Sequence, residues 1–282
     1  SELGILHPQE GVLQGHFNPN EADKKKKINQ LQEGVSLLVK NPKLTPGESS
    51  DQKVGDLITG YGTAESVRHF YSIHGDSLKG KRVIIQGWGN VAAAAAYYLA
   101  QEEAIIVGII DRVGGLMKAE GFSFEEITDL FNNKTGNFLV AENLIPYDKL
   151  DGTIWNIGAE VFIPAAASRL ITRQQLHTLL ANGLEVISAG ANVPFADEEI
   201  FYGAIAEEAD EKCAVIPDFI SNCGMARVFG YLMSDEAIVQ DDAIFNDVSK
   251  TIHDALQAAY VKNPSKVLLT KTAYEIALAQ LI

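Results

Sequence analysis

Residues 83–92 read VIIQGWGNVA, and this stretch decides the fold that we expect. Its first part, Val83–Ile85, is a short β-branched run without charges, which is typical of a strand covered on both faces. Two glycines, Gly87 and Gly89, follow this run and open an alanine-rich segment that is expected to be a helix over Val91–Ala100. A strand, a glycine turn and a helix in this order form the context that a dinucleotide-binding fingerprint requires.

The residue types in the turn suit the phosphates of a dinucleotide. Gly87 allows a tight turn, Gly89 lets the backbone approach a pyrophosphate, and Ala92 keeps the third position small where the helix meets the sheet. The start of the helix presents free backbone amides and the positive end of the helix dipole to the phosphates. The residues of this turn that we expect to bind the cofactor are Gly87, Trp88, Gly89, Asn90 and Val91.

Asp111 supplies a second, independent signal. It follows the next expected strand, about 20 residues beyond the glycines, where a carboxylate meets the hydroxyls of the adenosine ribose. Because a carboxylate repels a 2′-phosphate, Asp111 favours NAD over NADP as the cofactor. Arg112 weakens this preference, since an arginine at this position can receive such a phosphate, so NADP stays open.

Short apolar runs alternate with helical patterns through the middle of the chain. This alternation predicts an α/β fold of the Rossmann type, with helices covering a doubly wound parallel sheet. The expected strands are Val83–Ile85, Ile105–Ile110, Val161–Ile163, Val186–Ile187 and Ala214–Ile216. The expected helices are Thr63–His74, Val91–Ala100, Phe124–Asn132, Arg173–Leu180 and Asp197–Ala206.

The two ends of the chain differ from this central part. We expect a short, atypical N-terminal segment over residues 1–55, the Rossmann domain over residues 56–240, and a helical C-terminal tail over residues 241–282 that caps the sheet. The further features expected at the two ends are a helix over Glu21–Val39 with the solvated lysine run Lys24–Lys27, a loop over Asn41–Asp51, and helices over Asn222–Met233, Asp242–Val261 and Thr270–Leu281.

Composition excludes several classes of partner. The 282 residues carry a formal net charge of −14, which argues against nucleic acid and anionic membranes. No apolar run is long enough to span a bilayer and the start Ser1-Glu2 does not resemble a signal peptide, so a cytoplasmic location is expected.

The six histidines form no HxxxH or HExxH pair, and Cys213 and Cys223 form no CxxC pair. We therefore expect no metal site and two buried thiols.

The stretch from Lys79 to Leu116 resembles the glutamate/leucine/phenylalanine/valine dehydrogenase family, whose fingerprint is QGxGNVG after a lysine-glycine-lysine entry. Its ending, IDRVGGL, is closer to the glutamate dehydrogenase branch than to the leucine branch. Four further segments match the family in order: Ile58–Gly62 resembles its ATGxG turn, Ile163–Ala166 its IPAA strand end, Gly190–Asn192 its GAN turn, and Ile216–Gly224 its IPDFxxNxG segment.

This resemblance implies further cofactor contacts. Thr59 and Asn192 would lie near the nicotinamide, and Asn222 would face the boundary between cofactor and substrate. Ala165 and Ala166 would line the nicotinamide pocket with backbone groups. The residue types alone leave simpler roles open, since the two alanines could end a strand and Asn192 could be a turn residue in a left-handed conformation.

The resemblance also implies an activity, the NAD(P)-dependent oxidative deamination of an amino acid to a 2-oxo acid, or its reverse. In the family, a substrate domain before the ATGxG turn supplies a lysine in a GGxK segment and an aspartate in a PxxD segment. Neither segment occurs here, and residues 1–55 are too few for that domain, so the catalytic acid and base are not assigned. Three alternatives follow: a dehydrogenase represented mainly by its cofactor domain, a non-catalytic NAD-binding module derived from one, and another oxidoreductase on the same scaffold. Substrate identity and a homo-oligomeric state stay open.

Overall fold

A computed structural model describes residues 21–47 and 51–280 of the chain. Its centre is a six-stranded sheet with the strand order β3-β2-β1-β4-β5-β6. The strands are β1 (Arg82–Gln86), β2 (Ile105–Asp111), β3 (Gly114–Met117), β4 (Val161–Pro164), β5 (Val186–Ser188) and β6 (Ala214–Ile216). Neighbouring strands run parallel except β2 and β3. The expected Rossmann-type α/β fold is thereby confirmed.

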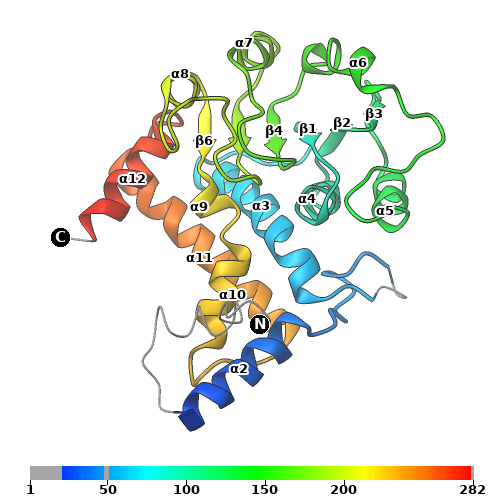
Figure 1. Cartoon of the computed structure of the whole chain (residues 1–282). Coiled ribbons are helices and arrows are strands. Elements are labelled where there is room, and N and C mark those ends of the chain that lie inside the picture. The colour runs from blue at the N-terminus through cyan, green and yellow to red at the C-terminus, as the bar shows by residue number, and fades with distance from the viewer. Residues whose placement is uncertain (1–20, 48–50, 281–282) are drawn as a thin grey trace.

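Helices cover both faces of the sheet (Figure 1). Alternate residues of β1 pack into different cores, with Val83 and Ile85 in one and Ile84 in the other. The first core includes residues of α3 (Val54–Ile73), α4 (Asn90–Gln101), α5 (Phe124–Asn132), α10 (Gly224–Leu232) and α11 (Asp241–Lys262). The second includes residues of α6 (Tyr147–Leu150), the 3-10 helix η1 (Ile154–Asn156), α7 (Arg173–Ala181) and α8 (Ala204–Lys212).

Helix α3 begins at Val54, not at Thr63 as the sequence pattern predicted. The segment that was expected to be a glycine turn, Ile58–Gly62, therefore lies inside this helix. Its glycines have a packing role. A Cβ atom on Gly60 would lie 2.4 Å from the backbone oxygen of Val91 in α4, and one on Gly62 would lie 3.1 Å from the Ile252 side chain in α11. The absence of side chains lets α3 approach both helices closely.

The sequence also failed to predict β3 as a strand. β3 pairs antiparallel with β2 at the edge of the sheet, and Asp111 lies opposite Gly114. Two of its four residues are glycines, which are depleted in strands. Gly115 is nevertheless suited to this place, because a Cβ atom there would lie 2.0 Å from the backbone oxygen of Ile109.

The boundaries of two other helices were also wrong. The helix expected over Asp197–Ala206 is α8, which begins at Ala204. Asp197 caps it from the preceding loop, because its carboxylate accepts hydrogen bonds from the backbone N–H groups of Ile205 and Ala206 at 2.7 and 3.0 Å. The helix expected over Glu21–Val39 is α2 (Glu21–Val35), which ends before a bridge between Leu38 and Lys53. The helix expected over Asn222–Met233 is confirmed within two residues as α10, and the short helix α9 (Asp218–Ser221) precedes it.

The C-terminal helices close one side of the molecule. Helix α11 packs along α3, and α12 (Leu269–Ala279) packs against β6 (Figure 1). The expected end of the last helix at Leu281 lies outside the described residues. The proposed domain boundary at residue 56 falls in the first turn of α3, and the boundary at residue 241 falls at the start of α11.

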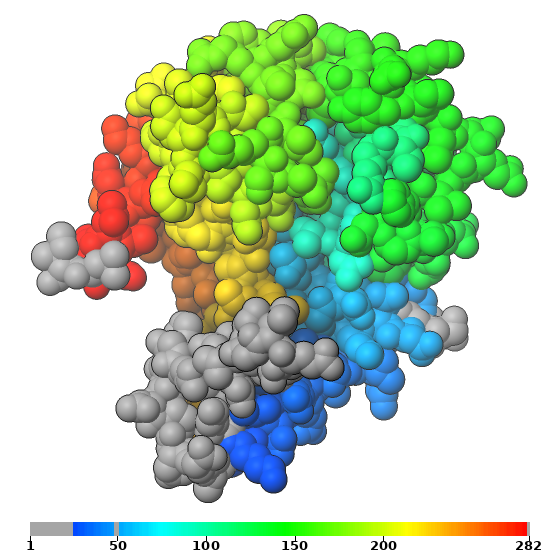
Figure 2. All heavy atoms as spheres, in the orientation of Figure 1, coloured from blue at the N-terminus to red at the C-terminus, as the bar shows by residue number. Residues whose placement is uncertain are grey.

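Helix α2 lies at the end of the molecule opposite α7 (Figures 1 and 2). It packs against α10, where a Cβ atom on Gly34 would lie 2.4 Å from the Leu232 side chain. Of the lysine run, Lys25 and Lys26 are exposed and Lys27 forms an ion pair with Asp235 at 2.6 Å. Among the helices that the structure describes, none combines the length and apolar character needed to cross a membrane.

Candidate functional site

A cleft of about 640 Å³ opens where β1, β2 and β4 end. This is the edge of an open parallel sheet at which ligands bind in α/β folds. The cleft is lined by Gln86, Gly87, Trp88, Gly89, Asn90, Val91, Ile110, Asp111, Arg112, Asn137, Tyr147, Ala165, Ala166, Ala167 and Leu170. The structure therefore brings the expected glycine turn, the expected acidic residue and the expected alanines to one place.

The glycine turn packs directly against the end of β4. Gly87 has a φ of +99°, and a Cβ atom there would lie 2.8 Å from the Cα atom of Ala166 and 2.9 Å from the backbone oxygen of Ala165. Gly89 is the N-cap of α4, and the first N–H group bonded within this helix is that of Ala93, to the oxygen of Gly89. The start of α4 thus has free amides, the kind of group that binds anions at helix N-termini.

Trp88 contributes to this turn in a way that its position in the fingerprint does not reveal. Its side chain is fully buried, and its indole N–H donates to the backbone oxygen of Leu130 in α5 at 3.2 Å. The indole therefore fastens the turn to α5, and only the backbone of Trp88 is directed to the cleft by this arrangement. The sequence prediction that Trp88 binds the cofactor applies at most to its main chain.

Lys134 lies beside this site, bonded to the cleft residue Asn90, and the sequence did not predict it. Its Nζ donates to Asn90 Oδ1 at 2.8 Å and to the backbone oxygen of Gly136 at 3.2 Å. Burial lowers the pKa of Lys134. The amide of Asn90 also donates to Asp56 Oδ1 at 3.4 Å. This places a positive charge next to the start of α4 in a chain whose overall charge is strongly negative.

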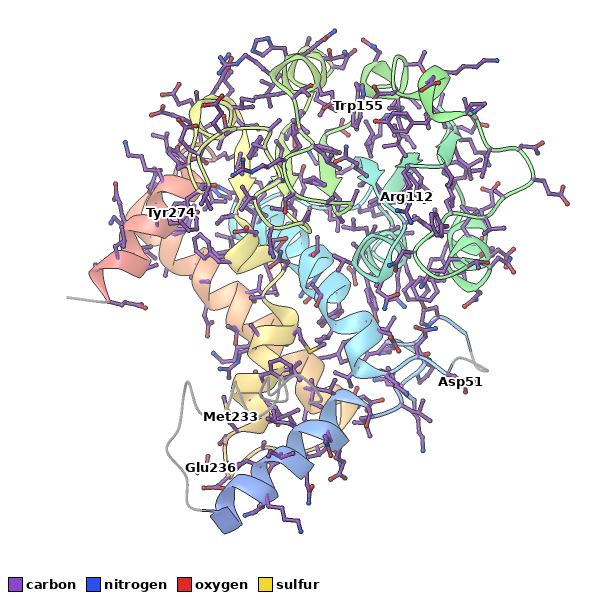
Figure 3. The ribbon with its side chains drawn as sticks, in the orientation of Figure 1. Asp51, Arg112, Trp155, Met233, Glu236 and Tyr274 are labelled. Atoms are coloured by element: carbon purple, nitrogen blue, oxygen red, sulfur yellow. The ribbon has the colours of Figure 1, made fainter. Side chains whose placement is uncertain are left out.

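Asp111 and Arg112 lie at the β2 end of the cleft. Asp111 is only 7% exposed, and its carboxylate accepts hydrogen bonds from the backbone N–H groups of Arg112 at 2.8 Å and Leu139 at 3.1 Å. These two amides fix the carboxylate in place. The guanidinium of Arg112 lies over the Phe138 ring, 4.1 Å from its centroid. Arg112 is labelled in Figure 3. Asp111 and Arg112 are therefore both held by the loop that follows α5.

The side chain of Gln86 indicates whether a dinucleotide would suit the cleft. Gln86 ends β1 and lines the cleft, and its side chain is only 7% exposed. Its Oε1 atom is buried without a hydrogen-bond partner among the described residues. A buried amide oxygen without a donor costs free energy, so a donor from a bound molecule would satisfy it. A dinucleotide, whose ribose hydroxyls are donors, suits this cleft.

A second, more open recess continues from the cleft toward β5. Its volume is about 400 Å³, and it shares Val91, Ala165, Ala166 and Ala167 with the cleft. The remaining lining residues are Thr59, Ser168, Gly190, Ala191, Asn192 and Asn222. The expected nicotinamide-side residues thus converge here, although they come from α3, the turn after β5, and the residue after α9.

Two of the polar side chains that line this recess, those of Asn222 and Asn192, are hydrogen-bonded to each other. Asn222 Nδ2 donates to Asn192 Oδ1 at 2.7 Å and to the backbone oxygen of Gly190 at 3.3 Å. Val193, which follows Asn192, has a φ of +46°, and its N–H donates to Asp218 Oδ2 at 2.9 Å. A positive φ is strained for a β-branched residue, and the hydrogen bond to Asp218 holds Val193 in this conformation. Asp218 belongs to the segment that resembles the family's IPDFxxNxG motif, but the sequence did not predict this role for it.

None of the residues that line the recess is ionisable in the part of the chain that the structure describes. Cys223 follows Asn222 but is only partly buried, contrary to expectation, and burial raises the pKa of its thiol to about 11. Cys213 is buried as expected. Among the described residues, no group of His, Cys, Asp and Glu could hold a metal ion.

Two of the histidines, His69 and His253, lie between α3 and α11. Their rings pack edge to face with centroids 5.1 Å apart, and His69 Nε2 lies 2.9 Å from Ser249 Oγ. Neither histidine lines the cleft or the recess. They pack two helices together and are not placed for proton transfer at this site.

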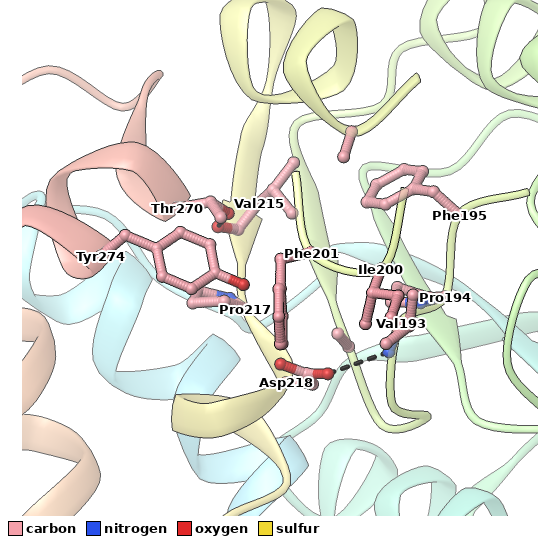
Figure 4. Close-up of a pocket in the computed structure, with 12 residues that line it drawn as sticks. Val193, Pro194, Phe195, Ile200, Phe201, Val215, Pro217, Asp218, Thr270 and Tyr274 are labelled. Atoms are coloured by element: carbon pink, nitrogen blue, oxygen red, sulfur yellow. Dashed lines mark hydrogen bonds between the residues drawn. The ribbon is translucent and has the colours of Figure 1, made fainter. Parts of the chain in front are cut away.

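A third hollow lies between the loop after β5 and α12, beside Phe201 and Tyr274 (Figure 4). Its volume is about 30 Å³, which is room for about one water molecule. Asp218 reaches from its rim to the N–H of Val193 (Figure 4). This hollow is too small for a nucleotide, so the cleft and the recess together form the candidate site.

Comparisons with known proteins agree with this geometry. Residues 53–282 match the family model described as Glutamate/Leucine/Phenylalanine/Valine dehydrogenase. The NADP-specific glutamate dehydrogenase of Psychrobacter sp. (strain TAD1) is 27% identical over 206 residues, which cover 70% of this chain and 45% of that protein. The NADP-specific glutamate dehydrogenase of Schizosaccharomyces pombe (strain 972 / ATCC 24843) is 30% identical over 190 residues, which cover 64% and 42%.

Solved structures show the same fold. The hetero-hexameric glutamate dehydrogenase from Thermus thermophilus, in its Leu-bound form, has a TM-score of 0.58 at 17% identity and covers 92% of this chain and 68% of that chain. The chain spans about half the length of the curated relatives that it matches. On the family match over most of its length, the chain belongs to the glutamate/leucine/phenylalanine/valine dehydrogenase family, on its glutamate dehydrogenase branch.

Proposed function

We propose that this chain is the nicotinamide dinucleotide-binding part of an NAD(P)-dependent amino-acid dehydrogenase that interconverts an amino acid and a 2-oxo acid. The observation that carries the proposal is the continuous cleft and recess at the sheet edge, which hold the phosphate-binding turn and the three polar residues Thr59, Asn192 and Asn222. A bound nicotinamide supplies hydride transfer to or from the substrate α-carbon. The chain's own residues bind and orient the two ends of the cofactor.

Within this proposal, NAD is the preferred cofactor. Asp111 presents a fixed negative charge where an adenosine ribose would lie, and a carboxylate repels a 2′-phosphate. Arg112 opposes this preference, but its guanidinium is already stacked on Phe138.

Titration of the purified chain with NADH and NADPH tests both the proposed binding of a dinucleotide and the preference for NAD over NADP. NADH is expected to bind below millimolar concentration and about tenfold more tightly than NADPH, the size of effect that one nearby charge produces. Asp111→Asn keeps one oxygen that can accept a hydrogen bond from a backbone amide, and it removes the negative charge. It should therefore reduce the difference between the NADH and NADPH affinities. Absence of NADH binding at millimolar concentration would refute the proposed function, whereas tighter NADPH binding would refute only the preference.

The chain alone is expected to bind cofactor without turning over glutamate. No ionisable side chain lines the recess among the described residues, and a positioned acid or base contributes about a hundred- to ten-thousandfold in rate. The measurement is NADH formation from NAD and glutamate, followed by absorbance beside a full-length glutamate dehydrogenase as positive control. Deamination above background that is lost in Gly89→Trp would contradict this prediction and assign acid–base groups to the chain itself.

The second candidate function is a binding module that holds NAD without catalysis. The recess that lacks ionisable groups is the observation in its favour. A GGxK segment in the natural coding sequence before Ser1 would decide for the enzyme, because that segment supplies the family's substrate lysine.

A further inference from the structure

A row of buried hydroxyl groups lies behind the recess. Ser221 Oγ lies 2.7 Å from Ser188 Oγ, and Ser188 Oγ lies 2.9 Å from Ser66 Oγ. Ser66 Oγ donates to the backbone oxygen of Thr63 at 2.8 Å. All four of these residues are 0% exposed. The hydroxyls therefore depend on one another for hydrogen bonds, with no access to solvent.

The direction of donation follows from the number of protons, since each hydroxyl has one. Ser66 donates its hydroxyl proton to the Thr63 carbonyl. In its contact with Ser188, the Ser66 hydroxyl can therefore only accept a hydrogen bond. Ser188 Oγ has two acceptors for its single proton, Ser66 Oγ at 2.9 Å and the Thr63 backbone oxygen at 3.2 Å, and it accepts from Ser221. Ser188 is the central member, because its hydroxyl contacts both other serines.

The three serines come from the three segments that carry the recess residues. Ser66 lies in α3 with Thr63, whose Oγ1 donates to the backbone oxygen of Thr59 at 3.0 Å. Ser188 ends β5, shortly before the turn that contains Asn192. Ser221 ends α9 and directly precedes Asn222.

We propose that Ser188 is a positioning residue that, through Ser66 and Ser221, fixes the mutual placement of Thr59, Asn192 and Asn222. This inference rests on the proposed function, because it assigns these three residues to the nicotinamide end of the bound cofactor. Loss of the central hydroxyl leaves the buried Ser221 hydroxyl without its partner and removes the link to Ser66, which keeps its bond to Thr63. The three segments are then free to shift relative to one another. The cleft that would hold the adenosine and pyrophosphate lies outside this series.

The test compares NADH with ADP-ribose, which lacks the nicotinamide, by calorimetric titration of the full chain. Ser188→Ala is expected to weaken NADH binding about tenfold and to change ADP-ribose binding by less than about twofold. Thr270→Val is the matched control. It removes another buried hydroxyl, which donates to the Val215 backbone oxygen at 2.7 Å outside the series, and should leave both affinities unchanged.

The outcomes separate the two proposals. A wild-type chain that binds neither ligand refutes the proposed function. A wild-type chain that binds both, with Ser188→Ala either weakening both equally or leaving NADH unaffected, refutes the positioning role alone. If Ser188→Ala does not fold, Ser221→Ala breaks the series at its end and is expected to give the same selective loss of NADH affinity; equal losses for both ligands would overturn the inference.

Discussion

Replacing Gly87 with alanine is expected to weaken NADH binding at least about a hundredfold. Two effects act together. The residue has a φ of +99°, which a side chain adopts only under strain, and the added Cβ would lie 2.8 Å from the Cα atom of Ala166 and 2.9 Å from its nitrogen. Because both contacts are with backbone, the turn must move away from β4. That movement displaces the start of α4 from the phosphates, and NADH titration measures the loss.

Gly183→Ala is the matched control for this substitution. Gly183 has a φ of +95°, close to that of Gly87, but a Cβ atom there would meet nothing within 4 Å. It lies in the turn between α7 and β5, at the edge of the sheet opposite the cleft. We expect the control to lower thermal stability through strain while NADH affinity stays at the wild-type level. Equal affinities in the two variants would show that the close approach of Gly87 to Ala166 has no role in binding.

Glu65 is expected to make the fold acid-sensitive. Burial opposes its ionisation, but hydrogen bonds from Arg68, His69 and Ser249 outweigh that cost and lower its pKa from 4.5 to about 2. Arg68 binds both carboxylate oxygens at 2.6 Å. A carboxyl group with a lowered pKa in the folded state stabilises the fold above pH 4.5. It loses this contribution, about 3 kcal/mol, as the pH falls from 4.5 toward 2.

Glu65→Gln should therefore lower the free energy of unfolding by about 3 kcal/mol at pH 7 and by progressively less as the pH approaches 2. Urea denaturation of both proteins at several pH values isolates this difference from the titration of other carboxyl groups. Glu120→Gln, at an exposed position, serves as the control for the substitution itself. A constant difference between wild type and Glu65→Gln from pH 7 to pH 2.5 would contradict the assignment. Because Glu65 joins α3 to Ser249 in α11, the variant also tests how α3 is held.

The sequence predicts local features of this fold well where a single segment determines them. The β-branched run of β1, the glycines and the alanines of α4 each have a local signature, and the structure places them as expected. The glycines of Ile58–Gly62 were misread because they occur in a helix, where glycine is disfavoured. Glycine is needed in this segment because α3 approaches α4 closely, and only the folded chain reveals this approach.

The same distinction applies to the candidate site. Asp111, Thr59, Asn192 and Asn222 belong to sequence motifs, and the structure brings them to the cleft and the recess. The motifs do not predict Lys134 and Gln86, because the importance of these two residues depends on contacts between distant segments or on a missing partner. Trp88 shows the converse, since a residue inside the fingerprint uses its side chain for the packing of α5.

The four residues shared by the cleft and the recess have an energetic consequence. Under the proposed function, two adjoining subsites on one sheet edge would act as a bivalent receptor for a ligand whose two halves are covalently joined. Once the adenosine half was bound, the other half would be confined beside its own subsite, and its contacts would form at a high effective concentration. Each separate mononucleotide would pay the full entropy of association, so the sheet edge would select for the intact dinucleotide over its fragments.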